Sequence, residues 1–376
     1  MQKHILRAVI VLIILTGVFA CTSAVFAADN GFVPAVRVVC EGTVKAEFSE
    51  AQLRAIDSGS VYTYSCANHM GNSRIYKGQG PAVLQLIEQA GIDLDKIPAN
   101  RIISIKGVDG YGIRITKGQL TEPRYSYQQE TGQASAVPAI LDISPRGEGT
   151  LCIGQAAPGE QNYPAFVSYV AYKDDNGSTG EINITSDIAE KAPEPAAMGS
   201  SKTIEWGSSV RFSLNGFGKW DKIYYTTDGS APKLSSDIYN YNTFSTPVVC
   251  REITVPAGVS TFTVKAFTAA FGKADSSVAS YKYKVIPPAV KGVKASAASK
   301  SAKLSWKKIS KTDGYYVYRA TKKTGSYKKI ASVKGSKTTS CKDKTIKKGK
   351  TYYYKIRAYS GKSKGSFSKP VKVRAK

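Results

Sequence analysis

The chain has 376 residues, of which 42% are hydrophobic and 22% are charged. This length corresponds to about two to four domains, and the composition excludes a disordered tail, a collagen-like fibre and a disulfide-dense miniprotein. The net charge of +25 is placed unevenly: residues 290–376 hold 27 basic residues and two acidic ones, Asp313 and Asp343, whereas the rest holds 26 of each sign. The entire excess therefore belongs to one segment.

The first 27 residues have the pattern of a secretory signal. Two basic residues precede an apolar run over residues 8–15, and Ala24-Val-Phe-Ala27 offers small residues at a cleavage site before Ala28. We predict that residues 1–27 are removed and that the protein is secreted, associates with the cell envelope and has no membrane span after signal removal. Two alternatives stay open, an uncleaved anchor and lipidation of Cys21, because Val18-Phe-Ala-Cys21 is similar to a bacterial lipobox.

Export permits disulfides, and five cysteines follow the signal. Cys250 and Cys341 stand alone in separate segments, so an internal pair would join two of Cys40, Cys66 and Cys152. No CxxC or HxxxH spacing occurs, so we expect no metal site.

Few enzyme classes fit the residues after the signal. His69 is their single histidine, and no GxSxG, Walker or HExxH motif occurs. A histidine-rich metal centre is excluded, as is most Ser-His-Asp chemistry. We therefore expect no catalytic residues and a protein that is not an enzyme.

In chain order, residues 28–188 predict an α+β domain. Alternating or apolar runs predict strands, Ser49-Glu-Ala-Gln52 is a capping box that opens a helix through Ile56, and Val83, Leu84, Ile87 and Ala90 form one apolar stripe of a second helix that ends at Gly91. The predicted strands are 36–40, 43–48, 102–106, 113–116, 151–153 and 166–171.

Residues 189–198 predict a Pro-rich linker, and two all-β segments follow it, residues 199–286 and 287–376. Both contain short strands and turn residues without a helical period. Their strands recur at one offset, since Tyr224 corresponds to Tyr315 at 91 positions and Phe262 to Tyr352 at 90. Two tandem β-sandwiches of similar size follow from this spacing.

The last segment resembles a fibronectin type III domain. Leu304-x-Trp306 is similar to its tryptophan-bearing strand, and Tyr352-x-Tyr354-x-Ile356-x-Ala358 to its strand with a tyrosine corner, in which a phenol bonds a nearby backbone group. The loop over residues 359–364 has no RGD sequence, so integrin binding has no support.

The middle segment resembles the Ig-like C-terminal domain of chitobiases and β-hexosaminidases, through Ile223-Tyr-Tyr-Thr-Thr-Asp-Gly-Ser230 and Ser280-Tyr-Lys-Tyr-Lys-Val285. In that family the domain is an accessory sandwich. We interpret Asp228 as a turn residue because Gly229 follows it. Glycan binding through exposed aromatic residues of this segment is a further possibility.

The first segment resembles a divergent sulfite-oxidase-type molybdopterin-binding fold of the kind seen in exported proteins of Gram-positive anaerobes. The resemblance rests on residues 76–120, with Leu84-x-Leu-Ile-x-x-Ala-Gly91 and Asp109-Gly-Tyr111, and on Arg124-Tyr125. It places Cys66 where those enzymes carry the thiolate that ligates molybdenum, with Asn68 and Arg74 nearby as cofactor-binding residues. The alternative function is accordingly a molybdenum-pterin-dependent oxidoreductase.

That fold also needs cationic donors for the pterin phosphate, and the chain departs from the family there. Residues 145–148 (Pro-Arg-Gly-Glu) and 166–169 (Phe-Val-Ser-Tyr) replace the family's His-Gly-x-Pro stretch and Lys-Trp pair, and the signal has no twin arginine. We therefore expect a head without a cofactor. Its possible ligand cleft contains His69, Asp109, Tyr111 and Arg124, for a small ligand or a protein that the sequence does not identify; alternatively, these residues hold turns and pack.

The basic segment predicts attraction to polyanions. Its lysines alternate with tyrosines, but no nucleic-acid recognition motif accompanies them, so no specific nucleic acid is expected. Outside a cell the available partners are anionic cell-wall polymers or glycans. Lysines that only keep a sandwich soluble are the alternative. The sequence as a whole predicts a non-catalytic, exported cell-surface binding protein of adhesion type.

Overall fold

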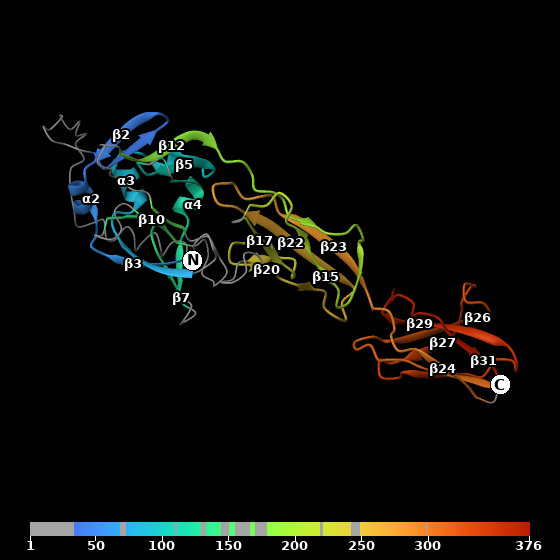
Figure 1. The fold of residues 1–376 in the computed structure, drawn as a ribbon. Helices are drawn as coiled ribbons and strands as arrows, with labels where there is room; N and C mark the ends of the chain where they lie inside the picture. Colours follow the sequence, from blue (N-terminus) through green and yellow to red (C-terminus); the bar gives the residue numbers. More distant parts are fainter. Residues whose placement is uncertain are drawn as a thin grey trace.

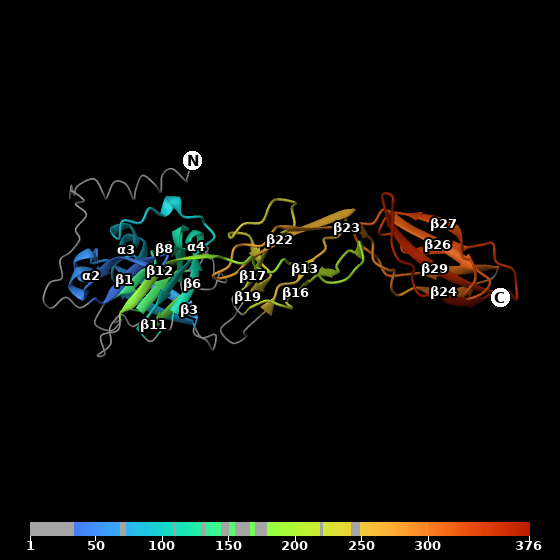
Figure 2. The same cartoon turned by 90° about the horizontal axis from the view of Figure 1, so that it is seen from above.

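The computed structural model describes residues 34–67, 73–108, 110, 112–128, 133–143, 150–154, 166–169, 179–218, 221–241, 249–298 and 300–376. They form three domains that follow one another in a row: a head with strands β1–β12, a middle domain with β13–β23, and a terminal domain with β24–β31 (Figures 1 and 2). The predicted signal, residues 1–27, and Cys21 lie outside the described residues. Among the residues that the structure describes, no helix is both long and apolar enough to cross a membrane.

The head is built on a five-stranded sheet with the order β2-β1-β12-β5-β6, in which β1 and β12 are parallel and the other pairs antiparallel. A three-stranded sheet β11-β10-β9 and the hairpins β3–β4 and β7–β8 complete it. The elements are β1 (Val36–Cys40), β2 (Thr43–Phe48), α2 (Glu50–Ile56), β3 (Val61–Ala67), β4 (Ser73–Gln79), α3 (Val83–Gln89), the 3₁₀ turn η1 (Leu94–Lys96), β5 (Arg101–Lys106), β6 (Gly112–Thr116), α4 (Lys117–Thr121), β7 (Tyr125–Gln128), β8 (Gln133–Ala136), β9 (Ile140–Asp142), β10 (Thr150–Ile153), β11 (Phe166–Tyr169) and β12 (Gly180–Ile188).

Helices α2 and α3 form where the sequence predicts them. Ser49 Oγ accepts a hydrogen bond from the Gln52 backbone N–H at 3.3 Å, and the Gln52 side chain accepts one from the Ser49 N–H at 2.8 Å, so the capping box is present. Helix α3 buries Val83, Leu86 and Ile87. Leu86, which the predicted stripe omits, is fully buried, whereas Leu84 is half-buried. The face of α3 that packs against the core therefore has the spacing i, i+3, i+4 from Val83 and includes Leu86 in place of Leu84.

The middle domain contains a five-stranded sheet, β14-β23-β22-β17-β18, in which β14 and β23 are parallel. Small antiparallel pairs close its other side. The strands are β13 (Ala196–Ala197), β14 (Thr203–Glu205), β15 (Ser209–Val210), β16 (Phe212–Ser213), β17 (Lys222–Thr226), β18 (Asp237–Ile238), β19 (Asn240–Tyr241), β20 (Val249–Cys250), β21 (Ile253–Thr254), β22 (Thr261–Ala269) and β23 (Ala279–Ile286).

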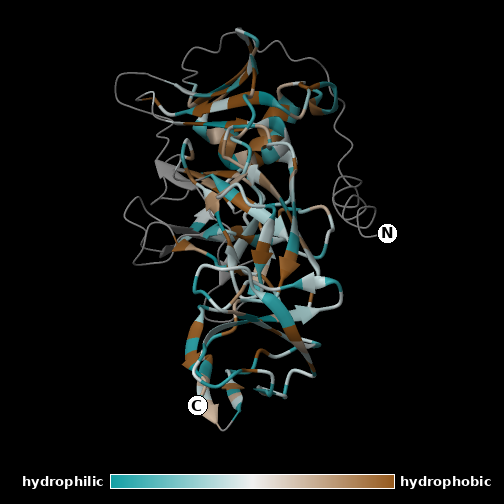
Figure 3. Cartoon of the chain, turned by 90° about the vertical axis from the view of Figure 1, so that its right-hand side faces the viewer, coloured by the Kyte–Doolittle hydropathy of each residue, from teal (hydrophilic) through white to brown (hydrophobic). Residues whose placement is uncertain are grey.

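The terminal domain is a sandwich of the sheet β24-β25-β28 and a second sheet in which β27, β26, β29 and β30 follow one another and β31 pairs with β29. Buried and half-buried residues alternate along β29. Figure 3 shows hydrophobic and hydrophilic residues interspersed along the strands of the chain. The strands are β24 (Lys294–Ala298), β25 (Ser301–Ser305), β26 (Gly314–Ala320), β27 (Lys328–Lys334), β28 (Ser340–Asp343), β29 (Thr351–Ser360), β30 (Ser363–Lys364) and β31 (Val371–Arg374).

The two sandwiches share the predicted offset. Tyr224 of β17 is paired with Phe267 of β22, and 91 positions later Tyr315 of β26 is paired with Ala358 of β29. The same antiparallel pair of strands therefore lies at the centre of both sheets. The two domains also touch, because Ile309 packs against the cores of both.

The head is docked onto the loop between β22 and β23. Gln119 of α4 donates hydrogen bonds to the carbonyl oxygens of Ala270 (2.8 Å) and Lys273 (3.2 Å) and accepts one from the Gly272 N–H (3.0 Å). The Phe271 ring packs against the head core. Residues 190–192 of the predicted linker also pair with Ala274, so the connection runs along the same interface.

Candidate functional site

The structure describes the side chain of one predicted cleft residue, Arg124. His69, Asp109 and Tyr111, and also Asn68, lie outside the described residues. Cys66 of β3 and Arg74 of β4 are opposite each other in one hairpin, but their side chains are not described either. The expected cofactor-free head and the ligation of molybdenum by Cys66 therefore both stay predictions.

Cys40, Cys152 and Cys341 occupy ordinary structural positions, and Cys250 is exposed. Cys40 is a free cysteine at the end of β1, so it forms no disulfide in this structure. Cys152 of β10 is buried beside Tyr64 and Ile140. Cys341 packs partly buried against the terminal core, as its alternating strand predicts, and burial raises the pKa of its thiol. Among the described residues, no group of three or more His, Cys, Asp or Glu side chains could hold a metal ion.

Arg124 lies at the interface between head and middle domain. It directly precedes β7, and its carbonyl oxygen accepts the Val137 N–H at 2.9 Å. The residue is 5% exposed, and its guanidinium carbon lies 6.0 Å from the centre of the Phe271 ring. Its Nε and Nη2 atoms are buried and have no hydrogen-bond partner among the described residues. A buried charge with unpaired donors costs free energy, so this residue calls for an explanation beyond packing.

A cavity of about 190 Å³ opens beside Arg124. Head and middle domain both line it, so neither domain forms it alone. Its charged lining residues are Glu122, Arg124, Lys222, Lys273 and Asp275, and its larger apolar and aromatic ones are Tyr224, Leu234 and Phe271.

The charges of this cavity are arranged by depth. Lys222, the first residue of β17, is 1% exposed, and burial lowers its pKa to about 8 although Asp221 acts in the opposite direction. Burial likewise lowers the pKa of Arg124 to about 10. Glu122 and Asp275 are partly open to solvent, which places them at the mouth, although the docked domains remove part of their hydration. Desolvation, with repulsion from Glu122, raises the pKa of Asp275 to about 6, and desolvation raises that of Glu122.

Asp275→Asn is expected to stabilise the full chain at pH 7–8. The folded-state pKa of Asp275 is raised to about 6, so the ionised carboxylate opposes folding above that pH, and protonation removes the penalty as the pH falls to its unfolded value near 4. Because the side chain is exposed, we expect a gain of at most about 1 kcal/mol. Thermal unfolding at pH 8 and pH 4 checks this: a variant that gains as much at pH 4 as at pH 8 would contradict it.

A second feature lies on the outer face of the terminal domain. Alternate residues of β26 and β29 point away from the core, and residues of β27 and of the flanking loops lie beside them. We call the following set the cation–aromatic face: Tyr316, Tyr318, Tyr327, Lys329, Lys355, Arg357, Tyr359 and Phe367. Its cations lie over its rings: Lys329 Nζ is 4.7 Å from the Tyr316 centroid and Lys355 Nζ is 4.5 Å from that of Tyr327. Arg357 stacks on Phe367 at 4.5 Å.

The rings of the cation–aromatic face support one another. Tyr316 and Tyr359 are stacked with centroids 4.3 Å apart, and Tyr318 and Phe367 meet edge to face at 4.9 Å. Arg357 also donates to the Tyr318 hydroxyl from Nη2 at 2.7 Å. Phe367 stays 39% exposed. The result is an ordered surface in which fixed cations alternate with aromatic rings.

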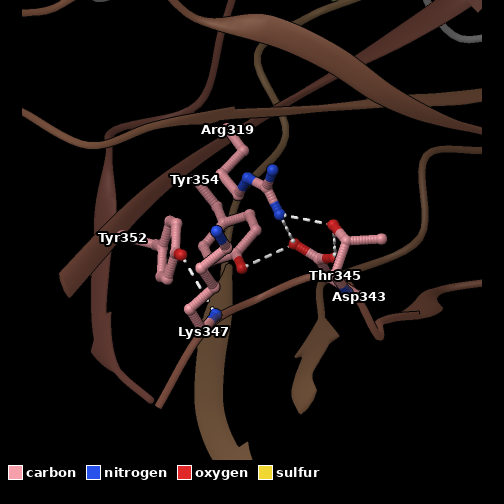
Figure 4. Close-up of polar contacts among 6 residues, drawn as sticks. All are labelled: Arg319, Asp343, Thr345, Lys347, Tyr352 and Tyr354. Carbon is pink, nitrogen blue, oxygen red and sulfur yellow. Dashed lines mark hydrogen bonds and ion pairs between the residues drawn. The ribbon is translucent and has the colours of Figure 1, made fainter. Parts of the chain in front are cut away.

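The basic segment holds two acidic residues, and one of them, Asp313, is exposed and donates its backbone N–H to the Tyr359 carbonyl oxygen at 2.9 Å beside the cation–aromatic face. Asp343 is buried and accepts hydrogen bonds from Tyr354 Oη (2.9 Å), Arg319 Nη1 (2.8 Å) and Thr345 (Figure 4). Asp313 accepts the Gly361 backbone N–H at 2.7 Å. Both acids of the basic segment are therefore engaged within the fold.

The tyrosine-corner prediction is confirmed. The Tyr352 hydroxyl accepts the backbone N–H of Lys347, five residues upstream, at 3.1 Å (Figure 4). Trp306, which directly follows β25, is buried and packs edge to face on Tyr315 with ring centroids 5.2 Å apart. Asp228 is a turn residue: its Oδ1 accepts the Ser230 N–H, and Gly229 has a φ of +88°.

Sequence reasoning missed Glu122, Lys222, Tyr224 and Asp275. One signal was available for Lys222, a lysine that begins the apolar run Ile223-Tyr-Tyr225 and so becomes part of a buried strand. For the two carboxylates no local signal exists, because they approach each other only when the head and the middle domain dock.

Comparisons with known proteins support the two sandwiches. Residues 288–374 match the fibronectin type III domain, and residues 202–280 match the chitobiase/beta-hexosaminidase C-terminal domain. Both are non-catalytic types of module, and such domains are typical of extracellular proteins. No curated protein matches the chain.

Among solved structures, a Fn3-like protein from Clostridium thermocellum is 28% identical, with 23% of this chain and 91% of that chain covered and a TM-score of 0.22. A two-domain fibronectin type III segment of chicken tenascin is 18% identical over 48% of this chain and 98% of its own, with a TM-score of 0.31.

Proposed function

We propose that the protein is a non-catalytic, exported surface protein whose terminal domain holds it on anionic polymers of the cell envelope. The head, which needs no cofactor in this proposal, is displayed on the two sandwiches. The supporting observation is the combination of 27 basic and two acidic residues in one segment with an ordered cation–aromatic face.

The cation–aromatic face contributes to anion binding beyond its net charge, because its cations are already ordered. Free lysines on a surface are mobile, and holding them on a partner costs side-chain entropy. Lys329, Lys355 and Arg357 already rest on aromatic rings, so less freedom is lost when an anion binds. A linear polymer with repeated phosphate or carboxylate groups would meet several such cations in succession along the sheet.

Binding of the full chain to poly(glycerol phosphate) is expected to weaken roughly tenfold or more between 50 and 200 mM salt, because each contact releases counterions. We expect Lys329→Glu combined with Lys355→Glu to weaken it further at fixed salt. Surface plasmon resonance on immobilised polymer, with neutral dextran as a blank, measures both effects.

Lys303→Glu with Lys342→Glu is the matched control. These exposed lysines lie opposite each other on β25 and β28, in the other sheet, so the net charge changes equally while the cation–aromatic face stays intact. Equal weakening by the two double variants would reduce the role of the face to net charge. Binding that does not respond to salt would contradict the proposal.

A further inference from the structure

The cavity between head and middle domain has the layout of a site for a small molecule with two opposite charges. Buried cations, Arg124 and Lys222, line its inner part, and exposed carboxylates, Glu122 and Asp275, line its mouth. The half-exposed Lys273 also lines the cavity, but its Nζ lies 3.9 Å from Asp221 Oδ2, which partly neutralises its charge. We propose that it binds a zwitterion of the size of a free amino acid, with the carboxylate directed to Arg124 and the ammonium group to Glu122 and Asp275.

Arg124 supports the first part of the proposal, a site for the ligand carboxylate. Its Nε and Nη2 form one edge of the guanidinium, the edge whose two N–H groups match the two oxygens of a carboxylate. Both atoms are buried and lack a hydrogen-bond partner in the described part of the chain. Native proteins rarely leave such donors unpaired, and a ligand carboxylate satisfies both together.

The carboxylates at the mouth support the second part of the proposal, a site for the ammonium group. Glu122 and Asp275 come from different domains and repel each other, which contributes to the raised pKa of Asp275. A cation placed between two carboxylates removes that repulsion. An ammonium group does so, and in an amino acid it is one carbon away from the carboxylate, so the two ends of the ligand meet the two charge types in turn.

The volume limits the size of the occupant. A cavity of about 150 Å³ holds benzene, and drug-sized ligands need roughly 300–1,000 Å³. At about 190 Å³ the cavity accommodates an amino acid but no oligosaccharide or peptide. Leu234 and Phe271 provide apolar surface for an aliphatic side chain.

The test is isothermal titration calorimetry of the full chain with L-leucine, 4-methylpentanoate and isoamylamine. The last two lack the ammonium and the carboxylate, respectively. We expect L-leucine to bind and each truncated analogue to bind roughly 10- to 100-fold more weakly. A panel of the other common amino acids then defines the preferred side chain. Failure of the entire panel, or binding of 4-methylpentanoate as tight as that of L-leucine, would overturn the inference.

Two substitutions locate the site. Arg124→Lys keeps the charge but removes the two-pronged edge, and Asp275→Asn removes one carboxylate while it is expected to stabilise the fold; each should weaken L-leucine binding at least tenfold. Because Asp275→Asn gains stability, lost binding cannot be ascribed to unfolding. Unchanged binding in both variants would reject the site.

The result is separable from the function proposed above, since the cavity does not involve the cation–aromatic face. Neither substitution should change binding to poly(glycerol phosphate).

Discussion

Replacement of Asp343 by alanine is expected to lower the free energy of unfolding of the terminal domain by about 3–5 kcal/mol. The carboxylate accepts hydrogen bonds from Tyr354, Arg319 and both the backbone and the hydroxyl of Thr345 (Figure 4). Its removal leaves the fully buried Tyr354 hydroxyl without its acceptor and the half-buried Arg319 without its counter-charge.

Asp313→Ala is the control for this change, because it removes the other acid of the basic segment, which is exposed and bonds one backbone N–H. We expect a loss of about 1 kcal/mol or less from it. Urea unfolding followed by tryptophan fluorescence measures both variants. An effect of Asp343→Ala no larger than that of Asp313→Ala would show that the network contributes little.

Lowering the pH should remove part of the stability that ionised Asp343 contributes, as the substitution by alanine does. Burial opposes ionisation of this carboxyl, but the hydrogen bonds from Thr345, Tyr354 and Arg319 outweigh it and hold its pKa below the ordinary value. A lowered folded-state pKa contributes stability above the unfolded pKa near 4, and this contribution is lost as the pH falls through the folded value. The difference between wild type and Asp343→Ala should therefore shrink in acid.

Gly272→Ala is expected to separate the head from the middle domain. Gly272 has a φ of +72°, and a Cβ atom there would lie 2.5 Å from the Arg114 carbonyl oxygen across the interface. The backbone strain costs about 1–2 kcal/mol, and the clash is with main-chain atoms that cannot rotate away. The hydrogen bonds of Gln119 to this loop would break as the domains move apart.

Gly207→Ala distinguishes the effect of backbone strain from that of the steric clash across the interface. Gly207 belongs to the same domain and has a φ of +73°, but no atom lies within 4 Å of the added Cβ. It should show the backbone strain alone. Calorimetry should resolve independent unfolding of the head in Gly272→Ala and not in Gly207→Ala, and L-leucine binding should be lost only in the former. Identical behaviour of the two variants would mean that the docking is not tight at Gly272.

The sequence predicts elements whose signals are local. Strands β1 and β2 and the capping box of α2 are readable because alternation and capping involve residues a few positions apart. Strand β12 was not predicted, although its run Glu181-Ile-Asn-Ile-Thr185 alternates polar and apolar residues and so carries a local strand signal. Its place at the centre of the head sheet, paired with β1 144 positions earlier, could not be read from that alternation. That pairing depends on tertiary structure.

The same distinction applies to the sites. Tyr352 was readable from its motif, because the tyrosine corner is made within five residues. Arg124 was selected as a cleft residue, but its surroundings come from a loop roughly 150 positions later in the chain. The alternation of polar and apolar residues does not indicate which two domain surfaces will contact each other. The cavity and the carboxylates that line it therefore could not be predicted from the sequence.

The parallel pairing of β14 with β23 determines how the protein responds to tension. The chain passes from the head through β13 into β14 and leaves β23 directly into the terminal domain, so a pull between the two ends drags the neighbouring strands β14 and β23 in opposite directions. The backbone hydrogen bonds between them, including Lys284 N–H to the Lys202 carbonyl and Trp206 N–H to the Ile286 carbonyl, then share the force together instead of opening one after another. In the role proposed above, with the terminal domain held on a polymer and the head pulled by flow, this shear geometry would give the middle domain mechanical resistance.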